Sequence, residues 1–112
     1  MSNETIRNNL VDSINELNHL LEVCQDSDQK FAIRMKTREL FQCLDKVIAA
    51  TLDSSTQEFN DAIESLQVLT SEAKEAKADL NKIAETVKRA EDALGKVETL
   101  VKNVAGGISA IT

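Results

Sequence analysis

The sequence predicts an all-α protein: a helical bundle with an antiparallel N-terminal helical hairpin and a long C-terminal coiled-coil-like helix. Two observations predict this class. The 112 residues contain no proline and only three glycines, so the usual punctuation of sheets and long loops is missing. Apolar residues recur at steps of three and four along most of the chain, which is the spacing of one helix face. Since the length suits one domain, residues 1–112 are expected to form a single helical domain.

The first helix is expected over residues 3–25. Its apolar positions follow steps of three or four, so a helix places them on one side, and strand alternation does not fit. This stripe consists of Ile6, Leu10, Ile14, Leu17, Leu21 and Cys24. The polar run at 25–28 follows, and its short side chains compete with the helical backbone and can cap the next helix. A hairpin turn is therefore expected there.

The second helix is expected over residues 29–52, with one apolar side facing the core. That side consists of Ile33, Leu40, Phe41, Leu44, Val47, Ile48 and Thr51. The next boundary is the polar run at 53–58, in which Ser55 and Glu58 have the spacing of a capping box.

The third helix is expected over residues 55–103. Its three-four spacing persists through most of the segment and is typical of a coiled coil. Small residues thin the stripe at 70–76, and Thr70-Ser71 can cap a new helix, so a bend near residues 70–72 is the alternative. Because no glycine or proline enforces that bend, we expect one helix that stops before Gly106-Gly107, with a flexible tail over residues 104–112.

The length of this third helix requires a partner for its second half. At 1.5 Å per residue the first two helices are each roughly 35 Å long, whereas the third would extend about 70 Å. If its overhanging apolar residues were exposed to water, the protein would lose roughly 1.5 to 3 kcal/mol of stabilisation from burial for each large side chain. Either the chain bends and closes a monomeric four-helix bundle, or a second copy covers the residues. We expect a homodimer that self-associates through Leu80, Ile83, Val87, Leu94, Val97, Val101 and Val104.

Charge and composition exclude several classes of function. The net charge of −6 makes nucleic acid an unexpected partner, because a phosphate backbone would be repelled. No apolar stretch approaches the roughly 20 residues of a spanning helix, so a membrane is not an expected partner. The N-terminus lacks the basic start and apolar run of a secretory signal, which predicts a cytoplasmic protein. No phosphate loop, nucleophile motif or metal signature is visible, so we expect no enzyme activity and no cofactor.

The single histidine offers two alternatives that involve chemistry. Glu16 and His19 have the Glu-x-x-His spacing of two-metal sites in helical bundles, but His19 is expected to point away from the core, where such ligands must lie. An outward histidine on a small acidic bundle also resembles the phosphotransfer domains, which follow it with Lys and Gly a turn later. This chain has Leu, Leu, Glu and Val at positions 20–23, and an acidic residue there opposes a phosphoryl group. A plain exposed histidine is favoured.

The two cysteines, Cys24 and Cys43, are expected to be reduced and to act as small apolar side chains. In a hairpin that turns near Ser27 they lie roughly 17 Å apart along the axis. A disulfide needs Cα atoms within about 7 Å.

One basic island is a candidate partner surface. Four cations lie between Asp28 and Glu39, and Phe31, Arg34, Met35 and Arg38 fall away from the expected core side. Aromatic residues, Met and Arg are enriched at interfaces. Alternatively, the helix starts later or Phe31 folds under the turn.

The sequence therefore predicts a non-enzymatic protein-protein interaction module, self-associating, that acts as adaptor, regulator, inhibitor or chaperone of another protein. The alternative is a membrane-active, toxin-like component that exposes its long amphipathic helix.

Overall fold

A computed structural model of the chain describes residues 2–49 and 56–111, and the side chains of residues 4–48 and 56–102. Its elements are α1 (Ser2–Val23), α2 (Ser27–Ala49), α3 (Gln57–Ala78), a short 3₁₀ turn η1 (Leu80–Lys82) and α4 (Ile83–Ile111). The described residues contain no strand, so the all-α prediction is confirmed. The elements form a four-helix bundle with principal extents of 49 × 21 × 18 Å.

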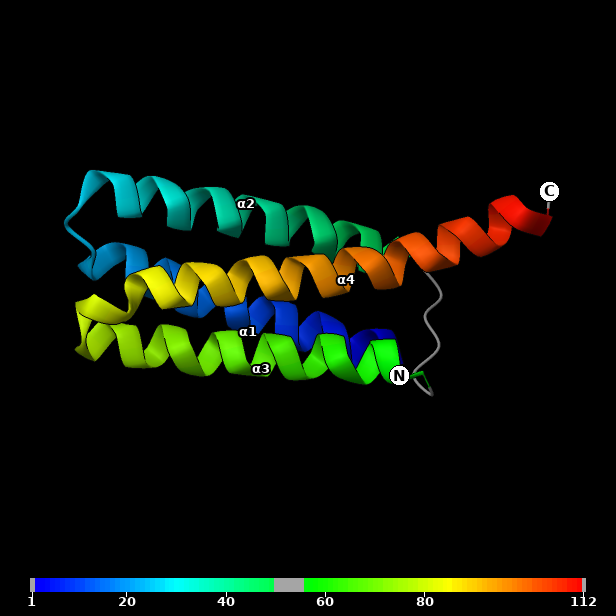
Figure 1. The fold of residues 1–112 in the computed structure, drawn as a ribbon, viewed down its shortest axis with the longest axis horizontal. Helices are drawn as coiled ribbons and strands as arrows, with labels where there is room; N and C mark the ends of the chain where they lie inside the picture. Colours follow the sequence, from blue (N-terminus) through cyan, green and yellow to red (C-terminus); the bar gives the residue numbers. More distant parts are fainter. Residues whose placement is uncertain (1, 50–55, 112) are drawn as a thin grey trace.

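The bundle consists of two helical hairpins that lie side by side, and both tight turns are at the same end (Figure 1). Consecutive helices run antiparallel. Helix α1 packs on α2 and α3, and α4 packs on α3 and α2. Helices α2 and α3 are therefore diagonal neighbours, and each helix occupies one corner of the bundle.

In the first hairpin, both ends of α1 and the start of α2 lie within two residues of the predicted bounds, and the predicted end at residue 52 lies outside the described residues. The apolar side of α1 was also predicted. The predicted stripe is buried except for Leu21, which is half-buried against the core. Leu20 and Ser13 are buried as well. The turn is fixed by Asp26, whose carboxylate accepts a hydrogen bond from the Gln29 backbone N–H at 2.9 Å. Because that bond satisfies a free donor of the first turn, Asp26 caps α2.

Helix α2 turns a narrower side to the core than the helical wheel predicts. Ile33, Leu40 and Val47 are buried, whereas Phe41 is 51% and Ile48 59% exposed, so their predicted core positions are wrong. The physical reason is that Phe41 and Ile48 share one flank of the wide apolar stripe, which lies beyond the contacts of α2 with α1 and α4. Thr37 is buried instead, and its hydroxyl donates to the Ile33 carbonyl at 2.8 Å.

Helix α3 begins one residue after its cap, Thr56, whose hydroxyl accepts a hydrogen bond from the Phe59 backbone N–H at 3.2 Å. The boundary was therefore predicted within two residues. The predicted cap, Ser55, lies outside the described residues, as does Thr51.

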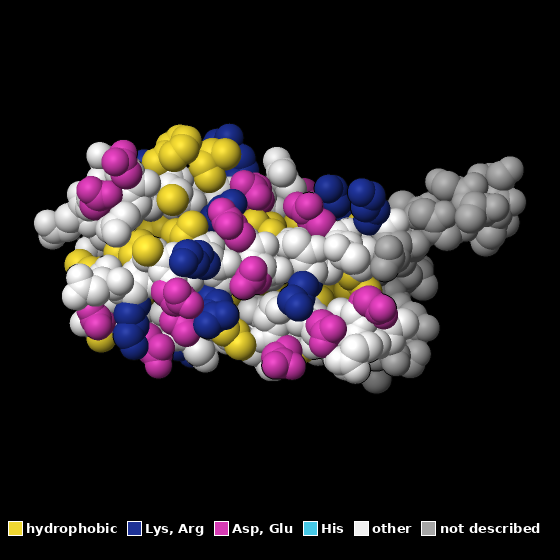
Figure 2. Space-filling view, in the orientation of Figure 1, with side chains coloured by type: hydrophobic (Ala, Val, Ile, Leu, Met, Phe, Trp, Pro, Cys, Tyr) yellow, Lys and Arg dark blue, Asp and Glu magenta, His cyan; other side chains and the backbone are white. Residues whose placement is uncertain are grey.

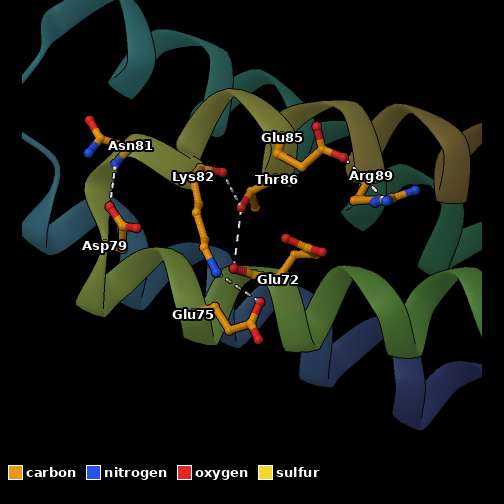
Figure 3. A network of polar contacts seen from close by, with 8 residues as sticks. All are labelled: Glu72, Glu75, Asp79, Asn81, Lys82, Glu85, Thr86 and Arg89. Carbon is orange, nitrogen blue, oxygen red and sulfur yellow. Dashed lines mark hydrogen bonds and ion pairs between the residues drawn. The ribbon is translucent and has the colours of Figure 1, made fainter.

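The prediction of one continuous helix over residues 55–103 is wrong, because α3 ends at Ala78. Asp79 adopts an extended conformation, and its carboxylate accepts the Asn81 backbone N–H at 3.1 Å (Figure 3). The hydroxyl of Thr86, at the start of α4, lies 3.3 Å from the Glu72 carbonyl of α3. These contacts reverse the chain about eight residues beyond the alternative bend at 70–72.

Thr70 does not cap a helix, because it lies inside α3. Its hydroxyl donates to the Leu66 carbonyl at 2.9 Å and lies 3.0 Å from the Ser13 hydroxyl of α1. Ser13 in turn reaches the Leu66 carbonyl at 3.2 Å. Thr70 thus helps to join α1 to α3.

Helix α4 continues to Ile111, so the predicted helix end near Asn103 is wrong, whereas the flexibility predicted for residues 104–112 stays a prediction. A glycine stop needs a left-handed residue, and no glycine among the described residues has a positive φ.

Candidate functional site

The residues predicted for self-association are largely covered by their own chain. Ile83, Leu94 and Val97 are at most 4% exposed, and Val87 and Val101 pack against the core. Leu80, in η1, is 42% exposed, and the side chain of Val104 lies outside the described part. The expectation that a second copy must cover this segment was therefore wrong, because α4 folds back onto α3. Self-association through these residues stays a prediction, but uncovered apolar surface no longer supports it.

His19 and Glu16 lie one helical turn apart on α1. The His19 side chain is 55% exposed, and its Nδ1 atom lies 3.9 Å from the Glu16 carboxylate. That carboxylate is held by Lys77 of α3 at 2.8 Å. The hydrogen bond from Lys77 is the main reason that the pKa of Glu16 is below its ordinary value, against an opposing contribution from burial. Glu16 therefore joins the two hairpins.

Metal ligands do not cluster in the described part of the chain: no three His, Cys, Asp or Glu side chains there could hold a metal ion. Cys24 and Cys43 are both free and buried, as predicted. Burial raises the pKa of the Cys43 thiol to about 11, so this thiol is protonated near neutral pH. Both cysteines act as small core side chains.

A shallow groove of about 270 Å³ runs between α3 and α4. Its lining is mostly charged and consists of Asp61, Glu64, Ser65, Val68, Arg89, Asp92 and Lys96. Arg89 is already paired with Glu85 of its own helix at 3.2 Å. Small-molecule sites are mostly apolar with a few converging polar groups. The mostly charged lining of this groove therefore differs from that of an ordinary small-molecule site.

The outer face of α2 is the most apolar surface of the described residues. Eight large hydrophobic side chains are exposed there and elsewhere, and four of them belong to α2. These four are Phe31 (65% exposed), Met35 (36%), Phe41 (51%) and Ile48 (59%). Figure 2 shows hydrophobic side chains gathered over the first half of α2 and its junction with α4, on a face that is otherwise mostly polar.

The predicted basic island lies on this same face. Phe31, Arg34, Met35 and Arg38 are all exposed, so Phe31 does not fold under the turn. Lys36 points to the side and pairs with Glu91 of α4 at 3.4 Å. Among the described residues, Arg34 and Arg38 form no ion pair. Their charges are therefore available to a partner.

We call six exposed residues of this face the α2 outer strip. They are Phe31, Arg34, Arg38, Phe41, Asp45 and Ile48, and Met35 lies beside them. The sequence prediction found the first half of this strip and missed the second, because it assigned Phe41 and Ile48 to the core. Their three-four spacing from Phe31 was the signal that could have found them.

No family model, no curated protein and no solved structure matches this chain. The described helices include none that is long and apolar enough to cross a membrane. The surface of the bundle is therefore the main guide to function.

Proposed function

We propose that this protein is a non-enzymatic protein-interaction module that binds a helix of another polypeptide chain along the α2 outer strip. The observation that carries the proposal is the concentration of exposed large hydrophobic side chains on α2. Single exposed apolar residues are ordinary on a protein surface, but α2 alone carries four of the eight exposed large hydrophobic side chains, and such a concentration on one helix is typical of an interaction site.

The chemistry of the strip supports a protein partner. Phe, Met and Arg are enriched at protein interfaces, and all three occur on this face. Covering Phe31, Phe41 and Ile48 would return up to roughly 1.5 to 3 kcal/mol for each side chain that becomes fully buried. Since Arg34 and Arg38 flank these residues, the partner is expected to carry acidic as well as apolar side chains.

The fold supports α2 as a rigid platform. The opposite side of the helix is anchored in the core by Ile33, Leu40 and Val47, each 0% exposed. Binding therefore does not have to order α2, and the entropic cost of association is smaller than for a disordered segment. A straight, exposed helix face suits a helix in the partner, which presents anchors at the same three-four spacing.

The location that we propose is the cytoplasm. Two free, buried cysteines in a small domain are what a reducing compartment maintains.

The test is affinity capture from a native lysate with a strip variant and a matched surface variant. Phe31→Ala with Arg38→Ala should reduce capture of the partner while helicity by circular dichroism stays unchanged. The control, Val68→Ala with Lys88→Ala, removes one exposed apolar residue and one cation from other faces, and should capture as the wild type does. Equal capture by the strip variant and the wild type would contradict the proposal.

A membrane-active function is the alternative that the same assays separate. It requires α4 to leave the bundle, which would expose Ile83, Leu94 and Val97 at roughly 1.5 to 3 kcal/mol each. Co-sedimentation with anionic liposomes that survives in the strip variant would favour this alternative over the proposed one.

A further inference from the structure

The α2 outer strip has the spacing of a coiled-coil seam. Its six residues follow one another at steps of three, four, three, four and three. Such steps place side chains in a line along one side of a helix, and all six side chains are exposed. The strip runs for about 26 Å along α2, at 1.5 Å per residue. Helix α2 therefore presents two lines of this spacing, one buried and one open.

We propose that the partner of the α2 outer strip is a second copy of this chain, bound strip to strip with the two α2 helices antiparallel. This inference rests on the proposed function and names its partner. A two-fold axis that crosses α2 between Glu39 and Leu40 relates the two copies. It places Phe31 of one copy opposite Ile48 of the other.

The same axis matches the charged positions of the strip. It places Arg34 of one copy opposite Asp45 of the other, and Arg38 opposite Phe41. Each match occurs twice, because a two-fold interface uses the same residues on both sides. From the ends of the contact to its centre, the pairs are therefore Phe31 with Ile48 (apolar), Arg34 with Asp45 (ionic) and Arg38 with Phe41 (cation–π). Each pairing is favourable. The strip is complementary to itself.

The charges that this arrangement uses are free in the single chain. Arg34, Arg38 and Asp45 form no ion pair within the described part of the protein. Lys36, which belongs to the same basic island, points toward α4 and is paired with Glu91 there. These three charges therefore belong to the side chains without an ion pair within the chain, and the two-fold arrangement brings each of them to a favourable partner.

Three other arrangements of the two strips pair the charges less favourably. A parallel pair of α2 helices would place Arg34 against Arg34 and Asp45 against Asp45. An antiparallel pair shifted toward the N-terminus by one heptad would place Arg34 against Arg38. A shift in the other direction would leave Asp45 against Phe41. Of these four arrangements, the unshifted antiparallel one pairs every charge favourably, so the charges of the strip favour that direction and register.

The position of α2 in the bundle permits this contact. Helix α2 occupies a corner and packs only on α1 and α4, so its outer face projects from the molecule. One pair of helices buries less than the roughly 1,200 Å² at which stable interfaces begin. We therefore expect a weak dimer, with a dissociation constant of about 10 to 100 μM.

Sedimentation equilibrium over a concentration range of about 1 to 1,000 μM tests the proposal, because it spans the dissociation constant expected from the interface size. The wild type should pass from monomer to dimer. Arg34→Asp should weaken the dimer about tenfold or more, because both ionic layers become repulsive, and Asp45→Arg should act similarly. The double variant Arg34→Asp with Asp45→Arg should restore the wild-type affinity, because it reverses each ionic layer without removing it.

Lys88→Asp on the exposed surface of α4 is the matched control. It changes the net charge as Arg34→Asp does and should leave the dimer unchanged. A wild type that stays monomeric over the whole range would overturn the proposal, and a double variant as weak as the single ones would overturn the register.

The two proposals fail in different ways. If the wild type is monomeric but the Phe31→Ala, Arg38→Ala variant still loses capture of another protein, the second copy is excluded and the interaction module stands. If neither dimerisation nor capture depends on the strip, both proposals are wrong.

Discussion

Two lines of three-four spaced residues differ in how far the bundle covers them: the line on α4 is apolar and buried, and the line on α2 combines apolar with charged residues and is exposed. The line on α4 includes Ile83, Leu94 and Val97, and the chain covers all three itself. The line on α2 includes Phe31, Phe41 and Ile48, and each is more than half exposed. Periodicity thus shows that a helix has an apolar side, but the arrangement of the other helices decides which side is covered.

The width of the apolar arc on each helix explains this difference. Both α2 and α4 pack on two other helices. The apolar residues of α4 lie within one arc, which those two neighbours cover. The apolar residues of α2 are spread over a wider arc, so the part beyond the two contacts stays open. The apolar residues of α2 are therefore exposed because the sequence spreads them over a wide arc, and they form a candidate surface for a partner.

The largest expected contrast is between truncations in the two lines. Leu94→Ala removes a side chain that is 4% exposed, and should lower the free energy of unfolding by about 3 kcal/mol. Phe41→Ala removes a larger side chain that is 51% exposed. It should change the free energy of unfolding by about 0.5 kcal/mol or less, measured at a concentration where the protein is monomeric. Urea titration of both variants checks the comparison. Equal losses would show that the two lines are covered to the same extent.

A smaller effect is expected where the two hairpins are joined. Glu16→Gln removes the ion pair with Lys77, which links α1 to α3, and should cost about 1 kcal/mol at neutral pH. Because the folded-state pKa of Glu16 is lowered, its contribution is present above the ordinary value of 4.5 and is lost as the pH falls through the folded-state pKa. Urea titrations at several pH values should therefore show the two proteins converging on acidification.

Lys77→Gln provides the control for this pair. It should cost a similar amount at neutral pH, and the double variant should cost less than the two single changes together, because both remove one interaction. Full additivity would show that the pair does not stabilise the bundle.

The smallest effect is expected on the outer side of α4. A Cβ atom added at Gly95 would meet nothing within 4 Å, so Gly95→Ala should raise the free energy of unfolding by about 0.5 to 1 kcal/mol. Thermal unfolding checks this gain. Ala93→Gly, two residues away on the buried side, should have the opposite sign. A destabilising Gly95→Ala would mean that α4 is rotated from its position here.

Much of the fold follows from local signals in the sequence. The first hairpin was predicted because short polar residues at 25–28 interrupt a regular stripe, and Asp26 does cap α2. The second reversal was missed because no glycine or proline marks it. Asp79 and Asn81 are the only Asp or Asn residues from 62 to 91, and they form the turn. Short side chains that bond to the backbone were thus sufficient to stop the helix.

The candidate site was predicted in part. Phe31, Arg34, Met35 and Arg38 were placed on an exposed face because they lie opposite the strongest apolar positions of α2. Phe41 and Ile48 were assigned to the core, since a helical wheel contains no information on where the neighbouring helices lie. The rest of the strip becomes visible only from the directions in which α1 and α4 pack on α2, which leave Phe41 and Ile48 exposed.

The most direct test of the account measures whether α3 and α4 fold back on each other within one chain. Asp61 and Lys96 line the same groove. Spin labels at these two positions, with both native cysteines replaced by alanine and the labelled chain diluted into unlabelled protein, report that distance. The hairpin predicts a separation of about 10 to 25 Å, given helix axes roughly 8 to 10 Å apart. A separation of about 50 Å, the length of 35 residues of straight helix, would contradict it.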